Sequence, residues 1–270
     1  MMVSMKKFTI LVGAVSLAMV LVFMVGCTRP ATGTILYHND NKLWRMAPDG
    51  TAIKKVADPG WFGEYSPDNS KIAFSEFYDK GVWVANADGT NPIQLTTFGS
   101  APAWSPDGSK LAFHVGGTVG KSRTIWIMNA DGTDAHQLST VNGSFANWSP
   151  RGELIIFHGE VNNGIWTIAP DGSRETQLYR DGGYPAWSPK GDEIAYVNLY
   201  DWCIWVMQAD GTERRKLTDH SGLQPTWSAD GNQIAYERVE DKKTGIWVIN
   251  ADGSGDHKIG KGGYHPDWSN

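Results

Sequence analysis

Three short apolar runs in this sequence end in a histidine: ILY precedes His38, LAF precedes His114 and IIF precedes His158. The equivalent run IAY precedes Glu237, and His265 lies near the end of the chain. Imidazole nitrogens and carboxylates are common ligands of catalytic metals. A set of such residues on one face is therefore a candidate metal site for lyase or hydrolase chemistry.

Motifs for other chemistry are missing from the sequence. It contains no G-x-S-x-G, H-E-x-x-H, C-x-x-C or glycine-rich phosphate loop. Cys203 is interpreted as a small filler, because no histidine lies near it in its own repeat. Aspartates in tight turns suggest calcium, but one or two carboxylates per turn fall short of the six to eight oxygens that calcium takes. The sequence therefore predicts turn stabilisation, no cofactor and no identifiable catalytic residue.

Aromatic residues are the other chemically informative group. Eleven of the 13 tryptophans recur at two positions of an internal repeat, and Trp61 and Trp202 do not. Aromatics beyond structural need indicate a recognition surface, since large rigid rings dominate binding energy. We expect about half of the candidates to pack under loops, with Trp61 and Trp202 exposed. The partner-binding candidates are Trp61, Phe62, Phe77, Tyr78, Tyr184, Tyr200, Trp202 and Tyr264.

The first 26 residues predict export. Lys6 and Lys7 precede 19 uncharged residues, 8–26, and Cys27 follows. The stretch MVGC resembles a bacterial lipobox, which implies a lipidated Cys27; an uncleaved membrane anchor is the alternative. In both cases residues 28–270 face the periplasm or cell exterior. Cys203 is then the one remaining cysteine, so stability must come from core burial without a disulfide.

A repeat of 39 to 43 residues organises the rest of the chain. A tryptophan-centred strand followed by an Asp-Gly turn occurs six times, as in GVWVANADGT and TIWIMNADGT. Each unit predicts four short strands: A with P-x-W-S, B with an I-A-F type run, C with I-W-V-M, and D ending in Q-L-T. Strands B and C are nearly continuous apolar runs, which indicates small sheets covered on both faces. The tryptophans are Trp44, Trp83, Trp126, Trp166, Trp205 and Trp247.

The two ends of the chain complement each other. Residues 34–59 contain strands B, C and D without A, whereas YHPDWS at 264–269 is a strand A alone. Together they complete a sixth blade, so we predict an all-β, six-bladed propeller over residues 34–270, with four antiparallel strands per blade. Residues 1–26 are predicted to be the signal or anchor, and 27–33 a short linker. Antiparallel pairing in the closing blade places His265 beside His38.

The pattern W-S-P-D-G…I-A-F…I-W-V-M-N-A-D-G-T…Q-L-T resembles the PD40, or WD40-like, repeats of TolB-type six-bladed β-propellers. The resemblance covers residues 34–269, and the seven residues after Cys27 leave no room for the separate N-terminal domain of TolB. It implies protein binding at one mouth of the propeller. The expected partner is a protein of the cell envelope, or a glycan, bound by a monomer.

The two faces of such a ring differ in sequence. The A–B and C–D turns are uniform and define a turn face, whereas the B–C and D–A connections define a variable face that carries the surplus aromatics. His38, His114, His158, Glu237 and His265 also map to the variable face. Strand B is not innermost, so these residues are too far apart for ligand bonds of about 2 Å, and we expect polar rim residues and no metal. The alternative function is a metal-dependent lyase or hydrolase acting on a glycan at the same mouth. The net charge of −5, without a basic stripe, argues against nucleic acid.

Overall fold

The computed structural model describes residues 33–77, 79–117, 122–160 and 164–269. These residues belong to one compact unit, Ala31–Asn270, and form 23 β-strands and no helix. Accordingly, the described part of the chain has no helix long and apolar enough to cross a membrane.

Some predicted features fall outside the described residues. These are Cys27, Tyr78, the segment 1–26 and the linker 27–33 apart from Gly33. The lipidation of Cys27 and the domain limits therefore remain predictions.

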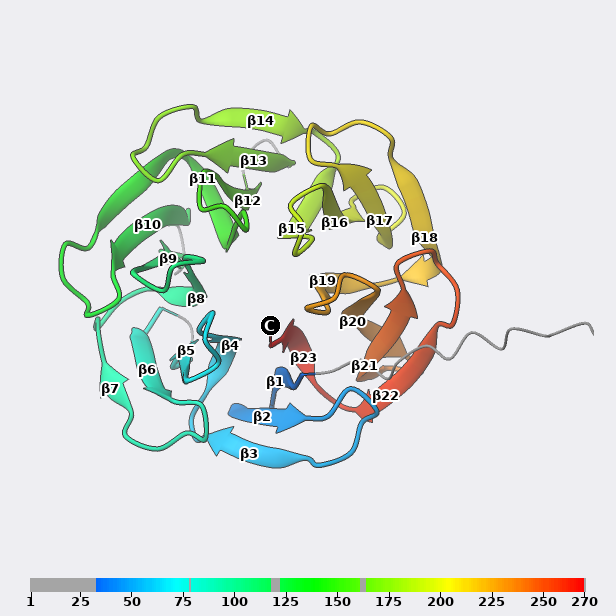
Figure 1. Cartoon of the computed structure of the whole chain (residues 1–270), viewed down its shortest axis with the longest axis horizontal. Helices are drawn as coiled ribbons and strands as arrows, with labels where there is room; N and C mark the ends of the chain where they lie inside the picture. Colours follow the sequence, from blue (N-terminus) through cyan, green and yellow to red (C-terminus); the bar gives the residue numbers. More distant parts are fainter. Residues whose placement is uncertain (1–32, 78, 118–121, 161–163, 270) are drawn as a thin grey trace, which may run out of the picture. The chain divides into compact units, whose positions relative to one another are not determined.

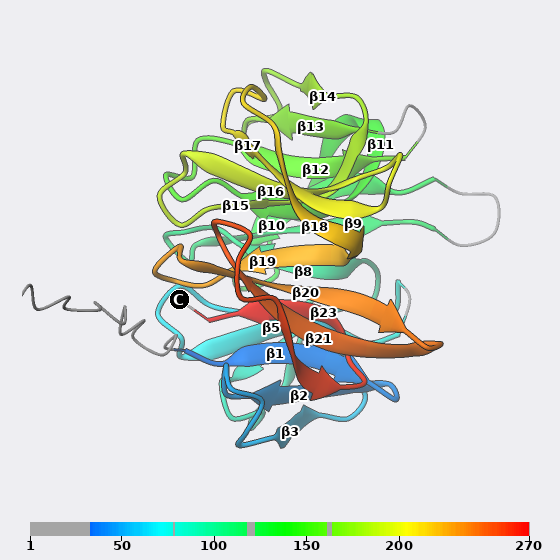
Figure 2. The same ribbon diagram turned by 90° about the vertical axis from the view of Figure 1, so that its right-hand side faces the viewer.

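The repeat units fold into four-stranded antiparallel sheets arranged around a central axis (Figure 1; side view in Figure 2). Alternating apolar strands and Gly-containing turns favour this meander, because each tight turn returns the chain antiparallel to the strand before it. Blade 1 consists of β4 (Trp61–Tyr65), β5 (Lys71–Ser75), β6 (Val82–Asn86) and β7 (Ile93–Gln94). Blade 4 consists of β15 (Gly182–Trp187), β16 (Glu193–Asn198), β17 (Cys203–Gln208) and β18 (Arg215–Ser221). Blade 5 consists of β19 (Leu223–Trp227), β20 (Gln233–Glu240), β21 (Lys243–Asn250) and β22 (His257–Lys261).

Blades 2 and 3 are joined into one seven-stranded sheet. The strand β11 (His136–Trp148) is 13 residues long, and it serves as strand D of blade 2 in its first part and as strand A of blade 3 in its second. The other strands are β8 (Ser100–Trp104), β9 (Lys110–Val115), β10 (Thr124–Asn129), β12 (Ile155–Gly159), β13 (Ile165–Ile168) and β14 (Thr176–Tyr179).

Blade 6 contains both ends of the described chain, shown in blue and red in Figure 1. Its strands are β23 (Tyr264–Trp268), β1 (Ile35–Asn39), β2 (Lys42–Met46) and β3 (Lys54–Ala57). The backbone N–H of Ser269 donates to the carbonyl of Thr34 over 2.9 Å, and Thr34 N–H donates to Ser269 Oγ over 2.7 Å. The predicted closing of the ring by one C-terminal and three N-terminal strands is thus confirmed.

The core lies between neighbouring blades. One apolar cluster joins Ile125 of blade 2 to Trp148 and Phe157 of blade 3, and another joins Ile204 of blade 4 to Tyr236 of blade 5. Residues of strands B and C on both sheet faces are therefore buried, as their continuous apolar sequence predicts.

The turn face is built by repeated side-chain hydrogen bonds. In the turn after β8, Ser105 Oγ donates to Asp107 Oδ1 over 2.6 Å and the backbone N–H of Ser109 donates to the same oxygen over 3.0 Å. These donors lower the pKa of Asp107 to about 2. Asp131 accepts equivalent bonds from Thr133. The predicted turn-stabilising role of these aspartates is confirmed at both positions.

Candidate functional site

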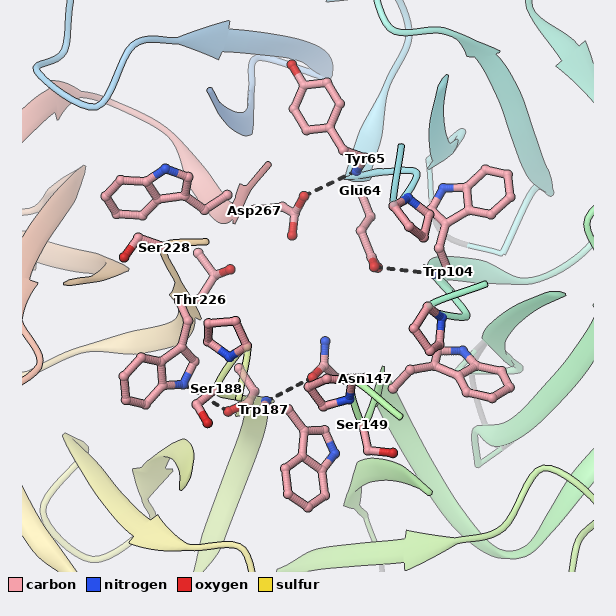
Figure 3. Close-up of a pocket in the computed structure, with 18 residues that line it drawn as sticks. Glu64, Tyr65, Trp104, Asn147, Ser149, Trp187, Ser188, Thr226, Ser228 and Asp267 are labelled. Carbon is pink, nitrogen blue, oxygen red and sulfur yellow. Dashed lines mark hydrogen bonds between the residues drawn. The ribbon is translucent and has the colours of Figure 1, made fainter. Parts of the chain in front are cut away.

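Strand A of every blade is innermost and lines a central channel (Figures 1 and 3). Two adjoining cavities occupy the channel, and both are lined by Glu64, Asn147, Ala186, Thr226 and Asp267. The cavity toward the turn face has a volume of about 380 Å³, and the one toward the variable face about 130 Å³. The cavity behind the variable face is therefore the smaller of the two.

Each strand A has a bulge three residues before the tryptophan or tyrosine that recurs in the repeat. The residue there is left-handed in all six blades, with φ between 48° and 54°, and the pairing register with strand B or its equivalent shifts beside it. A bulge redirects a side chain, and here all six residues line the same cavity. We call this set the collar: Phe62, Ala101, Phe145, Tyr184, Gln224 and His265.

The aromatic members of the collar touch across the channel. The ring centroids of Phe62 and His265 are 4.4 Å apart, those of Phe62 and Phe145 5.7 Å, and those of Phe145 and Tyr184 5.1 Å. Phe145 also stacks on His265 at 5.7 Å. Residues from blades 1, 3, 4 and 6 thus meet in one aromatic cluster at the variable-face end of the channel.

The histidines lie behind this cluster. The His38 ring stacks on Trp61 at 4.3 Å and on His265 at 4.8 Å, which confirms the predicted proximity of His38 and His265. His38 and His114 are buried, and burial lowers the pKa of His38 to about 4 and that of His114, also affected by Arg123, to about 3. These side chains are therefore neutral at pH 7.

Burial also shifts the pKa values of the other predicted rim residues. It is the main cause that lowers the pKa of His158 and of His265, and it raises the pKa of the buried Glu237 to about 7. The expectation of a polar rim is thus wrong for His38, His114 and Glu237, whose side chains are buried. No group of three or more His, Cys, Asp or Glu side chains among the described residues is arranged to hold a metal.

The aromatic candidates divide between exposed and half-buried positions. Tyr200 is 78% exposed, Trp202 49%, Phe77 41% and Tyr264 39%, whereas Trp61, Phe62 and Tyr184 are half-buried. The expected exposure of Trp202 is confirmed. That of Trp61 is wrong, because its ring stacks on His38 and contacts Phe77.

The loop between β16 and β17 presents the two most exposed rings. Asn198 organises this loop: its Oδ1 accepts from Tyr200 N–H over 2.9 Å, and its carbonyl accepts from Trp202 N–H over 2.8 Å. Because the backbone is fixed in this way, the exposed rings of Tyr200 and Trp202 extend from a hydrogen-bonded loop.

A second set of channel residues was not predicted from the sequence. They precede the aromatic residue of strand A in five of the blades, and we call them the inner ring: Glu64, Asn147, Ala186, Thr226 and Asp267. Asp267 accepts a hydrogen bond from the backbone N–H of Tyr65 in the next blade over 3.3 Å, and Glu64 accepts one from Trp104 over 3.3 Å. Asn147 accepts one from Trp187 over 2.9 Å (Figure 3).

The two carboxyl groups of the inner ring are recessed in the channel. Burial raises the pKa of Asp267 to about 7, and burial together with the charge of Asp267 raises the pKa of Glu64 well above its usual value. The sequence signal for them is the change from alanine in PAWS at 102–105 to acid in GEYS and PDWS. This change indicates a pair of channel acids only when strand A is known to line a channel.

Comparison with known proteins places the chain among propellers. The family model described as PD40, TolB beta propeller domain, matches residues 47–270. No curated protein matches the chain.

Solved structures share the fold at low sequence identity. TolB from Acinetobacter baumannii is 20% identical, with a TM-score of 0.79 over 89% of this chain and 67% of that one. A putative TolB from Agrobacterium tumefaciens is 18% identical, with a TM-score of 0.71 over 87% of this chain and 91% of that one. An oligogalacturonate lyase from Vibrio parahaemolyticus is 12% identical, with a TM-score of 0.58 over 84% of this chain and 79% of that one.

Proposed function

The chain belongs to the family of TolB β-propeller domains, and from this premise we propose that it is an exported, membrane-anchored module that binds a protein partner of the cell envelope through its variable face. A propeller fold alone does not define an activity, because the same fold carries enzymes, receptors and scaffolds. The proposal therefore depends on the chemistry of that face.

The distribution of exposed aromatic rings carries the proposal. Phe77, Tyr200, Trp202 and Tyr264 are exposed, and all lie in connections of the variable face or at the start of a strand A. They lie on the face that holds the channel mouth, whose collar includes Phe62, Phe145 and Tyr184. Tyrosine and tryptophan dominate binding energy at protein interfaces because they bury much area at low entropic cost. A partner covering this mouth would bury both the exposed rings and the collar.

Anchoring is proposed from the N-terminal sequence. Lys6, Lys7, the uncharged run 8–26 and Cys27 fit export followed by lipidation. A lipid on Cys27 would keep the propeller close to a membrane, where an envelope partner is available. An uncleaved anchor would have the same consequence.

The enzymatic alternative is less well supported. A metal-dependent lyase or hydrolase needs several ligating side chains around one point, and no such group occurs among the described residues. The histidines instead contact aromatic rings: His38 stacks on Trp61, His114 meets Phe145 edge-on and His158 is tilted against Tyr184. The likeness to an oligogalacturonate lyase is at 12% identity, which concerns the fold alone. Metal analysis of protein purified without chelators would separate the two functions.

Site-specific photo-crosslinking tests the protein-binding proposal. A benzophenone amino acid replaces Tyr200 on the variable face or, as a matched control, the exposed Glu213 in a C–D turn on the turn face. After irradiation of cells, we expect a discrete adduct of higher mass from position 200 and none from position 213. Equal adducts from both positions, or none from either, would contradict binding through the variable face.

A further inference from the structure

The side chains that line the channel include acids and aromatic rings. Its walls carry the carboxyl groups of Glu64 and Asp267 and the aromatic collar, and no lysine or arginine occurs among the described residues that line either cavity. Neither carboxyl group forms an ion pair within the described structure: Glu64 and Asp267 accept only backbone N–H groups of neighbouring blades. Two recessed acids thus lack a cationic partner.

A collar residue gives an independent indication of a missing donor. The side-chain oxygen of Gln224 is buried, and nothing in the described part of the chain donates a hydrogen bond to it. Buried carbonyl oxygens usually have a donor, because leaving one unpaired costs about 1–3 kcal/mol. Gln224 lines the same cavity as Glu64 and Asp267, so a ligand with several N–H groups suits this part of the channel.

The aromatic rings indicate the charge of that ligand. Ring faces attract a lysine ammonium or arginine guanidinium within about 6 Å of their centroids. Phe62, Phe145 and Tyr184 occur at the same level of the channel as Gln224. The collar is two residues from the inner ring along each strand A, a separation of about 7 Å. The long stem of lysine or arginine can cover that separation.

We propose that the channel receives one lysine or arginine side chain of the bound partner, which displaces the aromatic rings that meet in the collar and places its cation against Glu64 and Asp267. This inference rests on the proposed binding of a protein at the variable face, and it adds the chemistry that the partner must present. A neutral or acidic side chain would leave both acids unpaired.

Proton release is a consequence that can be measured. Burial raises the pKa of Asp267 to about 7, so this carboxyl group is partly protonated near neutral pH, and burial together with the charge of Asp267 also raises the pKa of Glu64. A cation beside them favours the ionised form, so its binding must expel protons. The affinity for a cation should then increase as the pH rises from 6 to 8, whereas a neutral ligand would show no such trend.

Calorimetry with two model peptides tests the inference on the full chain. The probes are acetyl-Gly-Gly-Lys-Gly-Gly-amide and its norleucine analogue, which has an apolar side chain of similar length and no charge. We expect the lysine peptide to bind at least about tenfold more tightly than the analogue, with proton release that differs between buffers of different ionisation enthalpy. Equal affinity of the two peptides, or no binding of either at about 10 mM, would overturn the inference.

Isosteric variants locate the site. Glu64→Gln and Asp267→Asn should each weaken binding of the lysine peptide about tenfold and reduce proton release, whereas the surface control Glu213→Gln should change neither. Tyr184→Ala should also weaken binding if the cation enters through the collar. An effect of the acids without an effect of Tyr184 would indicate entry from the turn face and overturn the link to the partner. Should an acid variant fail to fold, proton release by the unaltered chain still decides.

The inference and the proposed function can fail separately. If the crosslink from position 200 forms equally in the unaltered chain and in Glu64→Gln, and the two peptides bind alike, the cation inference is wrong and protein binding stands. If the peptides are discriminated but no crosslink forms, the channel binds a cation without a protein partner, and the proposed function is wrong.

Discussion

Single residues in the channel couple the fold to pH. The folded-state pKa of Asp267 is about 7, above the usual value of an aspartate, so the folded chain holds a proton that the unfolded chain releases. The stabilising contribution of this proton is fully present below about pH 4 and is lost as the pH rises through 7. Asp267→Asn removes this titration and can still accept from Tyr65 N–H. We expect the variant to match the parent at pH 4.5 and to exceed it at pH 8 by roughly 2–4 kcal/mol.

Urea unfolding at the two pH values measures this difference. Asp181→Asn, between strands β14 and β15, is the control for loss of a carboxylate outside the channel. A pH-independent difference between Asp267→Asn and the parent would show that Asp267 does not carry a raised pKa.

His38 affects the pH dependence of stability in the opposite direction to Asp267. Its pKa is lowered to about 4 by burial, so the unfolded chain binds a proton more readily than the folded chain. The stability from its neutral form is complete above pH 6.5 and is lost as the pH falls through 4. His38→Phe keeps a ring between Trp61 and His265 without a titrating group. It should lose less stability than the parent between pH 7 and 4.5 in thermal melts followed by circular dichroism, and an equal loss would contradict this.

At the scale of strands, the sequence was sufficient for the blades and their closure but not for the collar. The apolar runs, the S-P-D-G turns and the split blade follow from local patterns. The left-handed residue in each strand A does not, because phenylalanine, tyrosine and histidine occupy positions at φ near 50° that ordinarily favour glycine. We attribute this conformation to the packing of six strands around one axis, which overrides the preference of non-glycine residues for negative φ. The sequence of a single strand does not predict it.

Two alanines of β8 allow this strain to be measured. Ala101 is left-handed with φ of 50°, whereas Ala103 is in the regular part of the ladder opposite Ala112. Ala103→Gly should lower the free energy of unfolding by about 1 kcal/mol, through the entropy of the unfolded chain. Ala101→Gly relieves the left-handed strain as well, so we expect no loss or a gain of up to about 1 kcal/mol. Equal losses in urea titrations would show that the bulge is unstrained.

The closing strand can be tested by one side chain. Trp268 is buried against blade 6 and blade 5, in a cluster with Ile35, Met46 and Ile246. Trp268→Ala leaves a cavity where the two ends of the described chain meet, and it should cost about 3–5 kcal/mol. The measurement is the denaturation midpoint, with Tyr264→Ala, at the exposed start of the same strand, as the control. A small loss from Trp268→Ala would contradict a closure that depends on packing.

At the scale of the whole molecule, features formed by residues close together in the sequence could be predicted, and sites formed by residues far apart in the sequence could not. The variable face follows from local repeats, and so the surplus aromatics were found there. Glu64 and Asp267 belong to the first and last strands A, and they share a channel only after the ring has closed. The sequence around one of these carboxyl groups therefore does not indicate that the other lies in the same channel. The same holds for the collar, whose contacts join four blades.

The two tryptophans outside the repeat differ in exposure, so we expect their alanine variants to have opposite effects on binding and stability. Trp202 is 49% exposed on its loop, so Trp202→Ala should leave the thermal melt nearly unchanged while reducing the crosslink from position 200, because a partner would lose a large ring from its interface. Trp61 is half-buried on His38, so Trp61→Ala should lower the melting temperature by several degrees, as expected for lost packing of about 1–3 kcal/mol in a chain of this size. Binding affinity and stability are thus expected to separate on one face of the molecule. If Trp202→Ala unfolds early instead, the exposed ring supports the fold and the variable face loses its main binding residue.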